Sequence, residues 1–327
     1  MQRQTTGAIF ALIACALFSL KPILIKIAYS LDLTLNDIMF LRGSLSLPIY
    51  AVTLLLLCRS HENRQKVRAK LLPIAATGLL GYVFASALDL AGLQYVSAQL
   101  ERLIIFLFPS FVVLLNWGIT RQRPANIVWL ALLLGYSGIA TIVVTEFQLA
   151  GTHILIGAAL VLCSALVFAV YLLLSKTQIT AVGSDIFTSV ALGTASLILI
   201  VVNIPFVAPT SYSVNHWVLG IAIAILCTVL PSYFIGAAMA RMSPTRLSLI
   251  SNFGPALTAL FAVIWLDEVF TLSHAFGLAL VVFSVVLIQR RKETSAEKQR
   301  SPTDNTDAAL DKDVQINTQK IIDNGTR

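Results

Sequence analysis

Charged residues that interrupt long apolar runs are the side chains best suited to chemistry in this sequence. Glu101 and Arg102 stand side by side at the head of the run LERLIIFLFP, and Lys21 precedes Pro22 within another run. A charge in apolar surroundings is costly unless it is paired and hydrogen-bonded. These residues therefore indicate either an interface feature or a polar site inside the protein that needs them.

Five charged residues are candidates for substrate binding or ion coupling: Lys21, Arg42, Asp89, Glu101 and Arg102. Neighbouring Glu101 and Arg102 point about 100° apart on a helix, so each needs a partner on another helix. The simplest arrangement joins Glu101 or Asp89 with Lys21 or Arg42, because unpaired buried charges are unfavourable. The alternative is that Glu101 only stabilises the start of its helix, because the helix dipole favours an acid in the first turn and Ser97 can serve as the N-cap.

Uncharged polar residues and prolines complete the candidate site. The polar candidates are Tyr171, Ser232, Tyr233, Ser248 and Asn252. A proline inside a helix removes a hydrogen bond and favours a bend, and the hinge candidates are Pro22, Pro109, Pro231 and Pro255. Asn252 lies three residues before Pro255, where it can bond either the freed carbonyl or a ligand. Lys26, by contrast, is expected to extend its ammonium group to an interface.

The composition places these residues in a membrane protein. Of the 327 residues, 57% are hydrophobic and 12% are charged, and the mean hydropathy is +0.84, whereas soluble domains carry about 25% charged residues. The four cysteines lie in apolar stretches, so neither a disulfide framework nor a thiolate metal site is expected. The net charge of +7 comes from short loops and the tail, which points to membrane orientation and not to nucleic-acid binding.

Ten segments are apolar and long enough to cross a bilayer as helices, which takes about 20 residues each. They are 7–29, 36–58, 71–91, 99–119, 126–145, 154–174, 185–204, 216–237, 247–266 and 272–289. The predicted fold class is an all-α integral membrane protein. Residues 290–327 contain few large apolar residues and predict a disordered tail.

The loop charges predict that both termini are cytoplasmic. Basic residues occupy the loop 59–70, the turns that carry Arg121, Lys176 and Arg241, and the start of the tail. Acidic residues occupy the connections at the opposite ends of the apolar segments, and the connection 204–216 has no Lys or Arg. The tail is then cytoplasmic as well.

The chain repeats itself. A shift of 146 residues lays YVSAQLERLIIFLFPSFVVLL on RMSPTRLSLISNFGPALTALF, so that Ser97 meets Ser243 and Pro109 meets Pro255. This predicts two five-helix halves, residues 1–149 and 150–289. Because five is odd, the second half must cross the membrane in the opposite sense. The turn TRQRP after the fourth segment is basic, whereas LDEVF after the ninth is acidic, as inversion requires.

These motifs resemble the EamA-type transporters of the drug/metabolite transporter superfamily. The resemblance covers residues 7 to about 289, and Glu268 matches the glutamate of that family's acidic turn. It implies ten helices in two inverted repeats, a cavity walled mainly by the first, third, fourth, sixth, eighth and ninth helices, and export or exchange of small metabolites. The first half departs from the pattern, since Gln122 stands where the second half has Glu268.

We interpret the sequence as a secondary transporter of the bacterial inner membrane, without enzymatic activity or cofactor, that moves a small polar or amphipathic metabolite by alternating access. The expected partners are the substrate, the lipid bilayer and a proton or exchanged metabolite, and a homodimer is compatible. No GxxxxGK[ST] phosphate loop or HExxH metal motif occurs. An intramembrane enzyme that uses Asp89 and Glu101, and a passive channel, are the alternatives.

Overall fold

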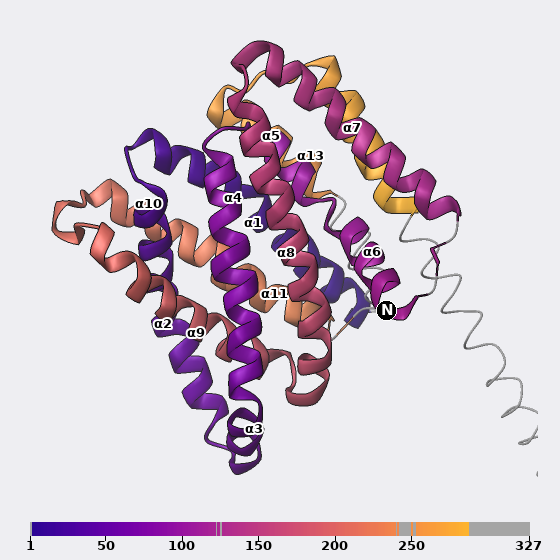
Figure 1. The fold of residues 1–327 in the computed structure, drawn as a ribbon. Helices are drawn as coiled ribbons and strands as arrows, with labels where there is room; N and C mark the ends of the chain where they lie inside the picture. The colour runs from indigo at the N-terminus through magenta and orange to yellow at the C-terminus, as the bar shows by residue number, and fades with distance from the viewer. Residues whose placement is uncertain are drawn as a thin grey trace, which may run out of the picture.

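Helices make up almost all of the described chain. The computed structural model describes residues 2–121, 123–124, 126–239, 241, 250 and 253–287, and these residues include no β-strand. In Figure 1 the helices form one bundle, with α4 and α8 running through its middle. The tail 290–327, predicted to be disordered, lies outside the described residues.

The helices of the first half follow the apolar segments closely. In chain order they are α1 (Gln2–Ser30), α2 (Leu35–Leu57), α3 (His61–Gly78), the π-helical segment η1 (Leu79–Phe84), α4 (Ala85–Leu93), α5 (Ala98–Ile105), α6 (Phe108–Thr120) and α7 (Asn126–Ala150). Together α3, η1 and α4 make one helical rod of 33 residues, His61–Leu93. The segment around Pro109 is interrupted, because α5 ends at Ile105 and α6 begins at Phe108.

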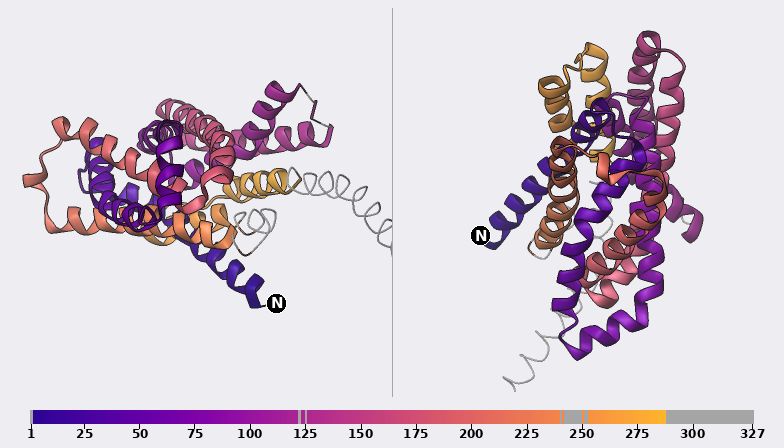
Figure 2. Two further views of the ribbon diagram at one scale, coloured as in Figure 1. Left: turned by 90° about the horizontal axis from the view of Figure 1, so that it is seen from below. Right: turned by 90° about the vertical axis from the view of Figure 1, so that its left-hand side faces the viewer.

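The second half is built in the same way. Its helices are α8 (His153–Val182), α9 (Ser184–Asn203), the short 3₁₀ turns η2 (Ile204–Phe206) and η3 (Pro209–Ser211), α10 (Val214–Ala224), the π-helical segment η4 (Ile225–Val229), α11 (Leu230–Met239), α13 (Gly254–Leu266) and a last helix at Leu272–Leu287. Figure 2 shows the amino end of α1 projecting from the bundle, and α1 packs against α11 and α13.

The length and apolarity of these helices confirm an all-α membrane protein. Eight helical segments in the described residues are long and apolar enough to cross a membrane, and Gly254–Leu266 and Leu272–Leu287 are shorter apolar helices. Large apolar side chains such as Leu72 and Leu272 are 80% and 86% exposed. A surface of this kind is stable only against lipid.

Features of the first half recur in the second at a spacing of 146 residues. The π-helical segments begin at Leu79 and Ile225, and the 13-residue helices α6 and α13 begin at Phe108 and Gly254. Each of these helices ends in a left-handed residue, Arg121 with φ 59° and Asp267 with φ 53°. The same shift of 146 residues aligns the two stretches of sequence, so residues that match in sequence also match in local structure.

Several helix crossings bring backbones into direct contact at glycines, and two of them join one glycine to another. A Cβ atom at Gly138 would lie 2.8 Å from the carbonyl oxygen of Gly277, and one at Gly157 would lie 2.9 Å from that of Gly92. The α7 helix therefore packs closely on the last helix, as Figure 1 shows, and α8 packs closely on α4. The second crossing fixes the height of α4, which carries Asp89.

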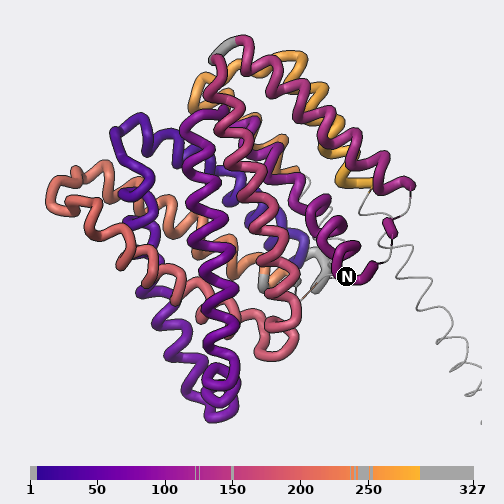
Figure 3. The backbone as a smooth tube through the Cα atoms, in the orientation of Figure 1, coloured from indigo at the N-terminus to yellow at the C-terminus, as the bar shows by residue number. Residues whose placement is uncertain are grey.

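The chain turns at opposite ends of the bundle in alternation (Figure 3). The turns between α2 and α3 and between α8 and α9 lie at the lower end in that view, and the turn between α7 and α8 lies at the upper end. Helix α3 begins at His61, ten residues before the predicted span, because the loop predicted at 59–70 is rich in Lys, Arg, Glu, Gln and Ala. These residues favour helix even outside an apolar segment.

Candidate functional site

An ion pair joins α1 to α4 at the centre of the candidate site. The Lys21 ammonium lies 2.5 Å from Asp89 Oδ2, and the side chains are 24% and 2% exposed. Pro22 places Lys21 next to a position where α1 lacks a backbone hydrogen bond. This pair is one of the arrangements that the sequence predicts.

Glu101 extends the pair into a cluster. Its carboxyl is 2% exposed and interacts with the Asp89 carboxyl and with the charges of Lys21 and Arg102. Among the described residues, Asp89 Oδ1 and Glu101 Oε2 have no hydrogen-bond partner. Two buried carboxyl groups side by side can bind and release one proton as a unit.

Arg42 approaches the same cluster from α2 but bonds neutral groups. It is 5% exposed and donates through Nη1 to Ser86 Oγ at 2.6 Å and through Nη2 to the Tyr82 carbonyl at 2.9 Å. Tyr82 lies in the π-helical segment η1, so the guanidinium stabilises an irregular turn of the helix. Asp89 is within electrostatic range of Arg42 and is not in contact with it.

Arg102 leaves α5 in a different direction from Glu101, as their neighbouring positions on one helix require. Its guanidinium lies against the first residue of α13, since a Cβ atom at Gly254 would stand 3.0 Å from Nη2. Arg102 Nε is buried and has no hydrogen-bond partner among the described residues. The side chain therefore enters the protein, between α5 and α13, and does not extend along the membrane interface.

The uncharged candidates lie mainly in an aromatic layer next to these charges. Tyr171 packs edge-on against Tyr82, with ring centroids 6.2 Å apart. Ser232 lies 3.4 Å from the Tyr50 hydroxyl, and the buried Tyr233 hydroxyl has no partner in the described residues. Ser248 and Asn252 lie outside the described residues.

The four prolines occupy three kinds of position. Pro22 lies within the continuous helix α1, and Pro231 is the second residue of α11, which follows η4 without a break. Pro109 and Pro255 stand in the first turns of α6 and α13. A proline in a first helical turn lacks only a donor that would be unpaired anyway, so these two stabilise the breaks before them.

Two glutamates from outside α5, one in α7 and one in the turn after α13, cap the amino end of α5. Glu268 accepts hydrogen bonds from the backbone N–H groups of Ala98 at 2.8 Å and Gln99 at 3.3 Å. Glu146 accepts one from the N–H of Ser97 at 3.3 Å and one from its hydroxyl, and Ser97 Oγ in turn accepts from the N–H of Leu100. The predicted N-cap at Ser97 is confirmed. The first N–H groups of α5 are thus held by both halves of the chain.

These caps also bring histidine and lysine to the same end. His274 Nε2 lies 3.5 Å from Glu146 Oε1, while Nδ1 contacts Thr271 at the start of the last helix. The Lys26 ammonium lies within electrostatic range of Glu268, Glu146 and Glu101. Lys26 therefore lies near the acids that cap α5, and its position at a membrane interface stays a prediction.

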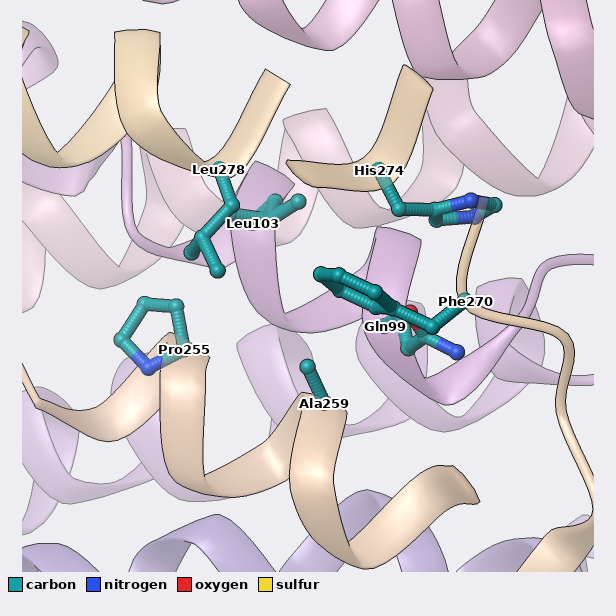
Figure 4. Close-up of a pocket in the computed structure, with 7 residues that line it drawn as sticks. All are labelled: Gln99, Leu103, Pro255, Ala259, Phe270, His274 and Leu278. Atoms are coloured by element: carbon teal, nitrogen blue, oxygen red, sulfur yellow. The ribbon is translucent and has the colours of Figure 1, made fainter. Parts of the chain in front are cut away.

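A small cavity lies beside this capped end (Figure 4). Its lining residues come from α5, α13, the following turn and the last helix: Gln99, Leu103, Pro255, Ala259, Phe270, His274 and Leu278. Gln99 is 2% exposed, and neither its amide oxygen nor its amide nitrogen has a partner among the described residues. The cavity is polar enough through Gln99 to hold a water molecule.

A second contact between the halves lies in the connection between α9 and α10. The Tyr212 hydroxyl donates to Asp37 Oδ1 at 2.6 Å, while Asp37 Oδ2 accepts from the N–H of Thr34 in a capping box at the start of α2. Burial and the neighbouring Asp37 carboxylate raise the pKa of the Tyr212 hydroxyl above its usual range. The hydroxyl therefore stays protonated and keeps donating.

Sequence reasoning missed the roles of Gln99, Glu146 and His274, and it assigned Glu268 only through resemblance. These residues act across helix boundaries, so no spacing within one helix indicates them. The one available signal in the sequence was the acidic character of the regions around Glu146 and Glu268, because the amino end of a helix attracts carboxylates.

A helical membrane protein in which charges from several helices converge on a buried centre has the architecture of a membrane transporter. The EamA-like transporter family model matches residues 5–144 and 155–290, and the chain belongs to that family and thus to the drug/metabolite transporter superfamily.

Relatives and a solved structure agree with this assignment. The chain is 26% identical over 314 residues to the uncharacterized transporter YcbK of Bacillus subtilis, covering 91% of this chain and 97% of that protein. It is 27% identical over 277 residues to the uncharacterized transporter YvbV of the same species, covering 82% and 85%. A known crystal structure superposes with a TM-score of 0.60 at 17% identity, covering 89% of this chain and 99% of that chain, which supports the fold.

Proposed function

We propose that this protein is a secondary transporter that exports or exchanges a small polar or amphipathic metabolite across the bacterial inner membrane by alternating access. The buried cluster of Lys21, Asp89 and Glu101 is the observation that carries the proposal. Charges this deep in a membrane protein are costly and are retained where a ligand or ion must pass. The relatives bear transporter names, which supports the general class.

The proposed mechanism moves two inverted five-helix repeats, residues 1–149 and 150–289, about the site between them. The recurrence of the π-helical segments and left-handed caps at one spacing, together with the two separate family matches, supports this division. The helix breaks next to Pro109 and Pro255 are the proposed flexing points, with Pro22 and Pro231 as further ones. Both termini and the tail 290–327 are then cytoplasmic.

The energy source in this proposal is a proton or an exchanged metabolite. In this proposal a proton travels on Glu101 or Asp89, which lie next to each other beside Lys21. A homodimer is compatible with this mechanism, and crosslinking in native membranes tests it.

Release from vesicles tests the proposed function. Purified protein is reconstituted into liposomes loaded with a bacterial metabolite extract, and the external solution is analysed by mass spectrometry. We expect a small set of metabolites to leave protein-containing vesicles at least tenfold faster than protein-free vesicles. Release of every small solute would indicate a channel, and chemical conversion of a metabolite without release would indicate an enzyme.

A further inference from the structure

The charges at the buried centre are unevenly paired among the described residues. Three cations and two acids converge there: Lys21, Arg42, Arg102, Asp89 and Glu101. Lys21 is matched by Asp89 through direct contact. Glu101 lies beside Asp89 and interacts with it as well as with Lys21 and Arg102, so neither acid is paired with Arg102 alone.

Arg42 and Arg102 differ in how many hydrogen bonds their N–H donors make with the described residues. Arg42 has two good hydrogen bonds, to Ser86 and to the Tyr82 carbonyl. Arg102 has no acidic side chain within 4.0 Å among the described residues, and its buried Nε has no acceptor there. A guanidinium presents five donors in a planar fork that fits a carboxylate or phosphate. Among the described residues, Arg102 is therefore the cation at the centre whose donors have the fewest partners.

The surroundings of Arg102 also favour a negative ligand. The guanidinium lies at the amino end of α13, a helix of 13 residues whose first N–H groups carry partial positive charge. A cation next to that end is unfavourable unless an anion lies between them. Glu101 cannot fill this role, because it is turned about 100° away on α5 and interacts with Asp89.

We propose that the transported substrate carries a carboxylate or phosphate group and that Arg102 binds this group at the start of α13. This inference rests on the proposed transport function and names the chemical class of the substrate. The bound anion pairs with the Arg102 guanidinium, which has no acidic side chain within 4.0 Å among the described residues. The remainder of the substrate then lies near the Lys21–Asp89 pair and the aromatic layer formed by Tyr82 and Tyr171.

The experiment uses the full-length protein in liposomes loaded with the bacterial metabolite extract. We expect the metabolites released by the wild-type protein to share an acidic group. Arg102→Gln should reduce their release at least tenfold, and Arg102→Lys should retain part of it, because an ammonium keeps the charge and loses the fork. The matched control is Arg68→Gln, which removes an exposed charge from α3 and should leave release unchanged.

A second variant covers the case in which Arg102→Gln does not fold. Gly254→Ala keeps every charge but places a methyl group 3.0 Å from Arg102 Nη2, where the anion would lie. We expect it to raise the concentration of acidic metabolite that gives half-maximal release at least threefold, with normal protein abundance.

The outcomes separate the two claims. Release of neutral or cationic metabolites alone, or equal release of acids by wild type and Arg102→Gln, would overturn the substrate assignment and leave the transport function standing. Wild-type half-maximal concentrations in Gly254→Ala would likewise count against Arg102 as the anion site. No release of any metabolite by the wild-type protein would overturn both claims.

Discussion

At the scale of single residues, the Lys21–Asp89 pair is proposed to serve both stability and transport. The Asp89 carboxylate is 2% exposed, whereas the Lys21 side chain is 24% exposed. Removing one member of a buried pair leaves the other without compensation, at a cost of about 3–5 kcal/mol, whereas replacing both by apolar groups can be neutral. The two roles can therefore be separated by comparing single and double variants.

We predict that Asp89→Asn lowers the thermal stability of the purified protein and abolishes release of metabolites. The double variant Lys21→Met with Asp89→Leu should regain most of the lost stability but no transport, because the apolar pair packs without binding substrate or proton. Differential scanning fluorimetry and the vesicle assay measure the two properties. The exposed pair Glu62 and Lys66 on α3 is the control, and Lys66→Gln should change neither. Wild-type transport by the double variant would remove this pair from the mechanism.

A second residue-scale prediction concerns Glu101. Its carboxyl shares a buried site with Asp89, so Glu101→Gln keeps the shape and hydrogen-bonding capacity and removes one proton-binding group. We expect release driven by a pH gradient to fall at least tenfold, equivalent to about 1.4 kcal/mol, while exchange of labelled for unlabelled metabolite at equal pH is reduced much less. Glu62→Gln is the matched control. Equal losses in the two assays would show that Glu101 binds substrate and does not couple protons.

Sequence alone predicts which residues form this charge cluster better than it predicts which groups they contact. The five charges were singled out because each interrupts an apolar segment, and the pairing of Lys21 with an acid follows from the cost of an unpaired charge. The partner of Arg42 was not predictable, because Ser86 and the carbonyl of Tyr82 are common groups whose availability depends on the π-helical turn. Gln99 was missed for a related reason, since one neutral amide in a helix carries no distinctive pattern.

At the scale of secondary-structure elements, α5 is held in place by groups outside its own sequence. The helix has only eight residues, so the unpaired N–H groups of its first turn are a large part of its backbone. Glu146 from α7 and Glu268 from the turn after α13 satisfy three of them. Because Glu268 belongs to the second half, this cap also connects the two halves beside the charge cluster.

We predict that Glu268→Gln loosens this connection. An amide keeps one acceptor but loses the charge that complements the helix dipole, and loss of a cap typically costs about 1 kcal/mol. We expect lower thermal stability and faster modification of a cysteine placed at Gln99, measured with a small thiol reagent. Asp267→Asn is the control, because asparagine also accepts the left-handed conformation at φ 53° and Asp267 is exposed. Unchanged cysteine reactivity in Glu268→Gln would exclude a role for this cap in closing the site.

The helices also show which structural features the apolar pattern predicts and which it does not. The ten apolar segments predict the helices well, because crossing a bilayer imposes length and composition. Pattern did not predict that α3 continues to His61 or that α8 continues to Val182, since polar helix formers extend helices beyond the membrane. The break between α5 and α6 was indicated by Pro109, whereas the π-helical segments η1 and η4 carry no residue that marks them.

At the scale of the whole molecule, the proposed inversion of the two repeats requires equivalent positions to face opposite sides of the membrane. Arg121 and Asp267 end two 13-residue helices with the same left-handed conformation, 146 residues apart. Their neighbours Arg123 and Val269 are both exposed. Local geometry is therefore matched at the two turns, and only the direction of the chain through the bilayer should differ.

The last prediction uses this matched pair to test the topology. In a background in which the four natural cysteines are replaced by alanine, Arg123→Cys and Val269→Cys are each treated with a membrane-impermeant maleimide in intact cells. We expect Val269→Cys to react at once and Arg123→Cys to react only after permeabilisation, because the positive-inside rule places the basic turn in the cytoplasm and the acidic turn outside. Glu62→Cys, on α3, should behave like Arg123→Cys. Reaction of both turn cysteines from the same side would mean that the two halves are parallel and would contradict the inverted repeat. Two parallel five-helix halves would also place the two termini on opposite sides of the membrane.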